Sequence, residues 1–209
     1  MMKGHLNRVV TATALLTVMC LTACAGKSPR VDFYTLSVAD SSASSSGAAT
    51  SCSNTVIAVG PINWPRYLDQ PRIVTRTGPN RLNFDEFHRW AGSLEDGFDR
   101  ALRKNLSGLL QSGLLVSNRQ ATRFKPEFRV GLDIEQFDGQ LGGDVILDVK
   151  WAITAIASGK LDTVHVSTIR EATTGPDYEA LVRASSVATA RLGQEIAAEL
   201  IKVCATNTD

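Results

Sequence analysis

The sequence is poor in the residues that most enzymes use for catalysis and metal binding. It has three histidines and four cysteines among 209 residues, without a His-x-x-x-His or Cys-x-x-Cys spacing. It also lacks a Gly-x-Ser-x-Gly nucleophile motif and a glycine-rich phosphate loop. We therefore expect a protein that is not an enzyme, with no catalytic residue, no metal site and no cofactor other than a covalent lipid.

The sequence also lacks an excess of charge of either sign. It contains 22 basic and 21 acidic residues, and the basic ones form no cluster. Because binding to phosphate backbones requires a concentrated basic surface, we expect no nucleic-acid partner. The composition, with 44% apolar and 21% charged residues, is ordinary for a globular protein, and the length favours one domain.

No apolar run is long enough to cross a bilayer, which needs about 20 residues. The apolar run Val9–Met19 follows a short basic segment and leads to Leu21–Cys24, a pattern typical of a bacterial lipoprotein signal. We expect cleavage before Cys24, which would carry the lipid, and the absence of Asp at position 25 favours the outer membrane. The alternatives are an ordinary secretory signal with a coincidental cysteine and a buried N-terminal helix.

Two cysteines remain once Cys20 is removed with the signal and Cys24 is acylated. Cys52 and Cys204 lie near opposite ends of an exported domain, so we expect a disulfide between them in an oxidising periplasm. The alternative is a pair of buried free thiols.

The chain divides into three parts. Residues 1–23 are the signal peptide, residues 24–53 hold the lipidated N-terminus, a first strand at 31–38 and a Ser-rich loop at 41–53, and residues 54–209 complete a single domain. Further strands are predicted from β-branched residues and alternating polarity at 56–59, 73–76, 81–84, 114–116, 128–135, 145–154 and 164–169. The turns Asp138-Gly139 and Gly142-Gly143 separate two of them.

Two long helices are predicted between and after these strands. Asn83 and Glu86 have the spacing of a capping box and would open the first helix, which buries Trp90 and ends near Gly108 or Gly113. The second helix begins with Pro176 at its first position and presents an apolar stripe from Leu181 to Val203. We therefore predict an α+β fold in which an antiparallel or mixed sheet is covered by two long helices on one face.

Three carboxylates could form a paired-acid catalytic site on one sheet face. Asp133 and Glu135 alternate with apolar residues in one predicted strand, and Asp148 lies in the next. A solvated or partner-facing sheet surface explains the alternation better. A periplasmic hydrolase is therefore the weakest functional alternative.

A specific motif lies between residues 64 and 106. The stretch Trp64–Leu82, followed by Phe87–Trp90, Leu94 and Asn105-Leu106, resembles the PqiC family of ABC-type transport auxiliary lipoproteins. The sequence departs from the family pattern at polar positions, where Gln70 and Arg72 exchange Arg and Gln and Gly92-Ser93 replaces Glu-Pro.

The resemblance implies a non-catalytic outer-membrane lipoprotein that works with an MCE-domain transport protein in moving lipids between the two membranes. Such a subunit would dock the periplasm-spanning tunnel and support envelope integrity. The alternative is a structural envelope lipoprotein that assists assembly of a secretion or lipopolysaccharide machine. Self-association into a homo-oligomer stays open.

The motif also contains the residues that we expect to contact the partner. Trp64, Arg66, Tyr67, Arg72 and Arg76 are of the types enriched in interface hot spots, and they stand in a proline-rich segment. The alternative is that Trp64 and Tyr67 pack this segment onto the core.

Overall fold

The computed structural model describes residues 29–38, 52, 54–110 and 114–206. The chain forms two units, residues 1–30 and 31–209, and the fold below is that of the second. Cys24 and the Ser-rich stretch apart from Cys52 lie outside the described residues. The predicted lipidation of Cys24 and the three-part division of the chain therefore stay predictions.

An eight-stranded mixed sheet forms the framework of this unit. Six strands follow one another in the spatial order β1-β4-β3-β6-β2-β5, while β7 pairs with β6 and β8 pairs with β7. The strands are β1 (Asp32–Tyr34), β2 (Val56–Asn63), β3 (Arg72–Gly78), β4 (Arg81–Trp90), β5 (Leu114–Ser117), β6 (Phe128–Gly139), β7 (Asp144–Ala155) and β8 (Lys160–Ala172).

The long strand β6 connects the two parts of the sheet. Along one edge it pairs antiparallel with β7, and along the other it pairs parallel with β2 and, at Gly139, with β3. The alternating apolar residues predicted in the seventh strand all point into the core, where Val145, Leu147, Val149, Trp151 and Ile153 are buried. Asp138-Gly139 is the end of β6 and not a turn, whereas Gly142-Gly143 does lie in the turn that follows.

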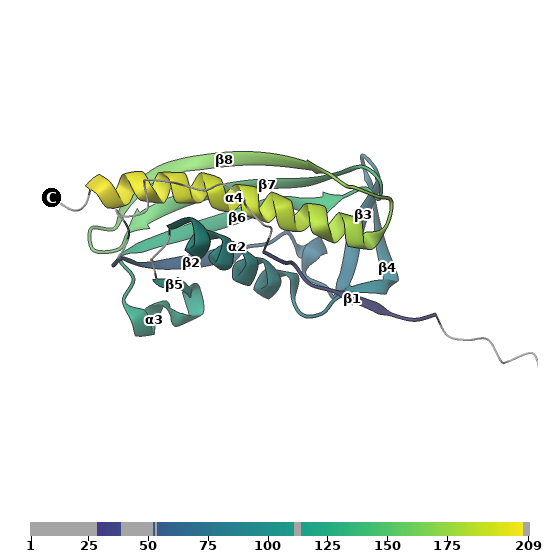
Figure 1. Cartoon of the computed structure of the whole chain (residues 1–209), viewed down its shortest axis with the longest axis horizontal. Coiled ribbons are helices and arrows are strands. Elements are labelled where there is room, and N and C mark those ends of the chain that lie inside the picture. Colours follow the sequence, from purple (N-terminus) through teal and green to yellow (C-terminus); the bar gives the residue numbers. More distant parts are fainter. Residues whose placement is uncertain (1–28, 39–51, 53, 111–113, 207–209) are drawn as a thin grey trace, which may run out of the picture. The chain divides into compact units, whose positions relative to one another are not determined.

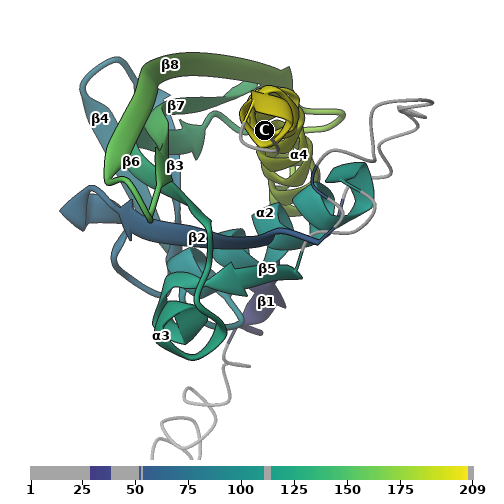
Figure 2. The same ribbon diagram turned by 90° about the vertical axis from the view of Figure 1, so that its left-hand side faces the viewer.

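Two long helices, α2 (Leu94–Leu110) and α4 (Tyr178–Thr206), lie beside each other against one face of the sheet (Figure 1). The end view shows the sheet curling around them (Figure 2). Short helical segments η2 (Arg66–Leu68), η3 (Asn118–Gln120) and α3 (Ala121–Phe124) lie in the connections. The predicted α+β class and the helix-covered mixed sheet are confirmed.

Small residues allow the two long helices to approach closely. A Cβ atom added at Gly193 of α4 would stand 3.4 Å from Asn105 Cβ and 3.6 Å from a Leu102 methyl of α2. Asn105 is 3% exposed, and its amide finds no hydrogen-bond partner in the part of the chain that the structure describes. Asn105 is part of the family motif, and in the structure it forms a helix-to-helix contact in the core.

The predicted start of the first long helix is wrong. Residues from Asn83 to Trp90 continue strand β4, and α2 begins after Ser93, whose Oγ accepts a hydrogen bond of 3.0 Å from the Asp96 N–H. Strand β4 pairs with β3 on one side and β1 on the other, so its backbone groups are already used. These long-range pairings outweigh a capping-box spacing, which is a local and weak preference.

The second long helix also begins slightly later than predicted. Asp177 caps it by accepting a 2.7 Å hydrogen bond from the Ala180 N–H, so Pro176 precedes the cap. At the other end of α4, Cys204 is joined to Cys52 by a disulfide with a Cα–Cα distance of 5.5 Å. The pair fastens the chain just before β2 to the last turn of the helix.

A bend in β2 directs the chain toward the start of α2. The pairing of β2 with β6 shifts between Val59 and Ile62, where Gly60 has a φ of +101°. A side chain at Gly60 would also meet Asn118, whose Cβ lies 2.9 Å from the added Cβ position. The bulge brings the segment after Asn63 beside the first turn of α2.

Candidate functional site

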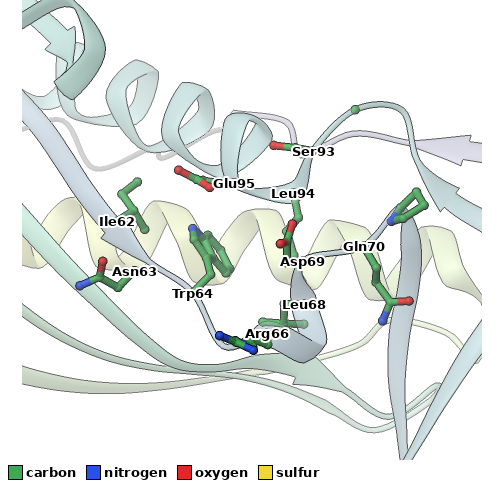
Figure 3. A pocket seen from close by; sticks show the side chains of 12 residues that line it. Ile62, Asn63, Trp64, Arg66, Leu68, Asp69, Gln70, Ser93, Leu94 and Glu95 are labelled. Carbon is green, nitrogen blue, oxygen red and sulfur yellow. The ribbon is translucent and has the colours of Figure 1, made fainter.

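A cavity of about 590 Å³ opens between the end of β2, η2 and the start of α2 (Figure 3). Its walls combine apolar side chains with polar ones at the rim. The lining residues are Ile62, Asn63, Trp64, Arg66, Leu68, Asp69, Gln70, Pro71, Gly92, Ser93, Leu94 and Glu95. Most of them belong to the segment that the sequence singled out, so the cavity is the candidate site of this chain.

Trp64 forms the floor of the cavity (Figure 3). Its ring meets Phe98 edge to face, with centroids 5.2 Å apart, and Phe137 lies 6.1 Å away. The indole Nε1 is buried and has no hydrogen-bond acceptor among the described residues. A buried donor without a partner costs about 1–3 kcal/mol. Because neighbouring atoms cover Nε1, an occupant of the cavity would meet the ring of Trp64 and not this nitrogen.

Tyr67 and Arg76 have a structural role beside the cavity. Both bind the Asp138 carboxylate, whose side chain is 0% exposed: the Tyr67 hydroxyl donates at 2.8 Å, and Arg76 donates through Nε at 2.9 Å and a terminal nitrogen at 2.8 Å. Gln136 adds a fourth hydrogen bond of 2.8 Å. The motif thus closes a buried ionic cluster that joins η2, β3 and β6.

This cluster shifts the titration of its members. Burial first, and then the hydrogen bond to Asp138, raises the pKa of Tyr67 well above its usual value. The hydrogen bond to the same carboxylate is the largest cause that raises the pKa of Arg76. Tyrosine therefore stays neutral and arginine stays charged, which keeps the Asp138 carboxylate fully hydrogen-bonded.

The two other arginines of the predicted contact set lie at the surface. Arg66 is exposed at the rim of the cavity. Arg72 is half-buried, hydrogen-bonds to Gln70 and Glu86, and lies 5.6 Å from the Phe84 ring centroid. The structure therefore brings Trp64 and Arg66 to the cavity, while Tyr67 and Arg76 lie at the buried cluster and Arg72 lies on the β3–β4 surface.

Sequence reasoning missed the acidic part of the site. Asp69 and Glu95 are exposed at the cavity rim, and Glu95 comes from the first turn of α2. It also missed the buried Asp138, because the Asp-Gly pair predicts a turn. The cavity could have been anticipated only with the correct helix start directly after Ser93, which places Glu95 next to the proline-rich segment.

A second polar cluster lies where β4 meets α4. His88 Nδ1 is 2.8 Å from Asp85, and its ring stacks on Tyr178 with centroids 3.8 Å apart. Although burial opposes it, the hydrogen bonds from the His88 ring and from the Phe87 and His88 N–H groups lower the pKa of Asp85. The cluster packs β4 onto the helix.

The other groups considered for chemistry do not line the cavity. Asp133 and Glu135 are exposed on the outer sheet face, where Glu135 pairs with Lys150 at 2.8 Å. His165 stacks on Trp151, far along the chain from His88. Within the described ranges, no three metal-ligating side chains come together and no helix is long and apolar enough to cross a membrane.

Solved structures with similar folds are distant in sequence. An uncharacterised protein superposes with a TM-score of 0.67 at 18% identity, covering 82% of this chain and 99% of that one. XCC0632 from Xanthomonas campestris, assigned to family DUF330, has a TM-score of 0.61 at 14% identity, with 72% and 86% covered. No curated protein matches the sequence. At these identities the likeness shows a shared fold.

The family comparison covers most of the chain. A sequence model described as the ABC-type transport auxiliary lipoprotein component matches residues 34–197, from β1 through most of α4. The match includes the cavity, the Asp138 cluster, the whole of α2 and α4 up to residue 197, and it agrees with the resemblance found in the motif. The chain belongs to the family of ABC-type transport auxiliary lipoproteins.

Proposed function

We propose that this protein is a non-catalytic outer-membrane lipoprotein subunit of an MCE-type intermembrane lipid transport system, and that the Trp64 cavity receives a segment of the MCE-domain partner. The family supports an auxiliary role in transport. The observation that carries the docking assignment is the open cavity of about 590 Å³, which the motif segment lines with the Trp64 ring and surrounds with charged groups at its rim.

The rim of the cavity suits a protein partner better than a single small ion. Arg66 offers a cation, while Asp69 and Glu95 offer anions. Mixed charges around an apolar floor match the usual anatomy of a protein interface, in which a buried aromatic residue is surrounded by polar groups. The same arrangement gives specificity by rejecting a partner loop with the wrong charges.

Capture of the MCE-domain protein from solubilised membranes by the mature lipoprotein tests the proposal. Arg66→Glu and Glu95→Lys reverse exposed rim charges and should each weaken capture about tenfold, because placing like charges opposite each other would cost at least about 1–2 kcal/mol. Arg123→Glu, on the exposed surface of α3, is the matched control and should bind as wild type.

Two results would contradict this function. Equal capture by the rim variants and the control would remove the cavity as the docking surface. Recovery of a secretion or lipopolysaccharide machine in place of an MCE-domain protein would favour the structural alternative.

A further inference from the structure

A second, smaller core attaches α3 to the outer face of the sheet. Ala121 of α3 packs with Ala58 of β2 and Val116 of β5, separately from the main core. Figure 2 shows α3 and α4 on opposite sides of β2. Beside this small core a hollow of about 630 Å³ opens between α3, the start of β6 and the end of β7.

The lining of this cavity, here called the α3 hollow, is cationic. Lys125 and Arg129 each bring a positive charge, Asn118 and Thr122 bring neutral polar groups, and Ile156 brings an apolar surface. Among the described residues, no acidic side chain lines the hollow, and neither Lys125 nor Arg129 forms an ion pair. The two positive charges are therefore not compensated inside the hollow.

The charged residues nearby do not compensate them either. Arg119 is already paired with an acid of α2, while Arg123 and Glu127 carry opposite charges and do not line the hollow. The next acid on β6, Asp133, lies four residues beyond Arg129, which is about 13 Å along an extended strand. This separation exceeds the screening length of about 8 Å at physiological salt. The hollow therefore keeps a positive potential.

Arg129 brings a charged group that has no acceptor. The buried residues Val130 and Leu132 point into the main core, so Arg129 leaves the opposite face of β6. Its Nε is covered by neighbouring atoms and has no hydrogen-bond partner among the described residues. The two terminal nitrogens are not enclosed with it, so an anion in the hollow can reach them. Because a partly buried charge without a partner is costly, such an anion would stabilise the guanidinium group.

Lys125 holds the second charge in a backbone conformation that lysine rarely adopts. Its φ of +47° lies in the left-handed region, and among the described residues it is the only non-glycine residue with a positive φ. Its N–H donates a 3.1 Å hydrogen bond to the Ala121 carbonyl and ends α3, a role that glycine fills with less strain. The backbone therefore favours glycine here, and what lysine adds is a charged side chain at the hollow.

We propose that the α3 hollow binds a phosphate group, with Arg129 and Lys125 supplying charge and Asn118 and Thr122 supplying further hydrogen bonds. Phosphate carries one or two negative charges and several acceptor oxygens, so it uses two cations and two neutral donors more fully than a carboxylate does. Ile156 is 37% exposed and gives the hollow an apolar wall, which suits an organic phosphate better than the bare ion. The phosphate can belong to a soluble ester or to a phospholipid headgroup.

Phosphorus NMR titration with glycerol 3-phosphate at constant ionic strength tests the site. A chain that begins at Ala25 is suitable, because the core cluster of buried residues runs from Leu36 to Cys204 and is kept whole. This chain should broaden and shift the phosphorus signal. Arg129→Gln and Lys125→Gln should each weaken the affinity about tenfold, since one hydrogen bond to a charged group is worth about that factor.

Two matched variants control for the loss of charge. Arg81→Gln and Lys104→Gln remove an exposed arginine and an exposed lysine that also lack an ion pair among the described residues. Both should bind glycerol 3-phosphate as wild type does. Equal loss in these controls would reduce the binding to general charge attraction and overturn the site.

Lys125→Gly separates binding from folding. Glycine adopts the left-handed conformation without strain, so the midpoint of urea denaturation should stay equal or rise. The affinity for glycerol 3-phosphate should nevertheless fall about tenfold, as it does in Lys125→Gln. Unchanged affinity in Lys125→Gly would contradict the proposal.

Vesicle sedimentation then identifies the source of the phosphate. Arg129-dependent binding to vesicles of phosphatidylglycerol and phosphatidylcholine assigns it to a lipid headgroup, whereas binding of glycerol 3-phosphate without vesicle binding assigns it to a soluble ester. Binding of neither probe overturns the proposal. The hollow shares no lining residue with the Trp64 cavity and the assays contain no transport protein, so a failed capture of the MCE-domain partner leaves these results unaffected.

Discussion

Among the described residues Arg76 is the only cationic partner of the buried Asp138 carboxylate, and replacing it by methionine removes that partner. The Asp138 side chain is 0% exposed, so water cannot solvate its charge unless the fold opens. Breaking a buried ion pair costs about 3–5 kcal/mol. Because the Arg76 side chain is itself 24% exposed, we expect the lower end, about 3 kcal/mol.

Urea denaturation of the oxidised protein at pH 7, followed by tryptophan fluorescence, measures this loss. Arg183→Met is the matched control, because Arg183 forms an exposed ion pair with Glu179 and its removal should cost less than about 0.5 kcal/mol. Adding Asp138→Asn to Arg76→Met should restore part of the stability, since no buried charge then remains. A loss below about 1 kcal/mol in Arg76→Met would refute the structural role of the cluster.

Further predictions concern the same chain. The pKa of Tyr67 is raised, so above about pH 10 the unfolded state loses a proton that the folded state keeps. The free energy of unfolding should therefore fall as the pH rises above about 10. Tyr67→Phe should reduce this fall in urea titrations at alkaline pH. A thiol count on denatured, unreduced protein without Cys24 should find Cys52 and Cys204 paired, and the bridge should contribute up to about 5 kcal/mol; two free thiols would exclude the bridge. Trp90 is only half-buried, so Trp90→Ala should cost about 1–3 kcal/mol in urea instead of the 3–5 of a fully buried ring. Cys24→Ala should abolish acylation, which mass spectrometry of the N-terminus detects.

Patterns with one dominant cause could be predicted from the sequence. In β7 the residues Val145 to Ile153 alternate because one face meets the helices, and the stripe from Leu181 to Leu200 follows the turn of α4. The start of α2 could not be predicted this way. In residues 83–90 the capping-box spacing and the apolar residues at every third position, Phe84, Phe87 and Trp90, both favour a helix. The strand depends on pairing with β1 and β3, which no local window contains.

The site was predicted only in part for a related reason. Tryptophan, tyrosine and arginine are enriched in interface hot spots, and the same residue types also serve as partners of a buried carboxylate. The residue type alone therefore does not distinguish the two roles. The difference lies in Asp138, which is 62 residues from Arg76 in the chain and reaches it through β6. Without knowledge of that pairing, Tyr67 and Arg76 could not be separated from Arg66, which the structure leaves at the cavity rim.

Helix α4 gives the N-terminal segment two points of attachment along its 29 residues. Near its start, Ser186 Oγ accepts a 3.1 Å hydrogen bond from the Ser37 N–H, and Tyr178 lies 6.5 Å from Tyr34, centroid to centroid. At its end, Cys204 holds Cys52 by the disulfide. A force applied through an N-terminal anchor would therefore act first on β1 and on its contacts with the start of α4. If β1 detached, the disulfide would still hold the chain before β2 to the end of α4. Loss of the disulfide should matter most when the anchor is under load.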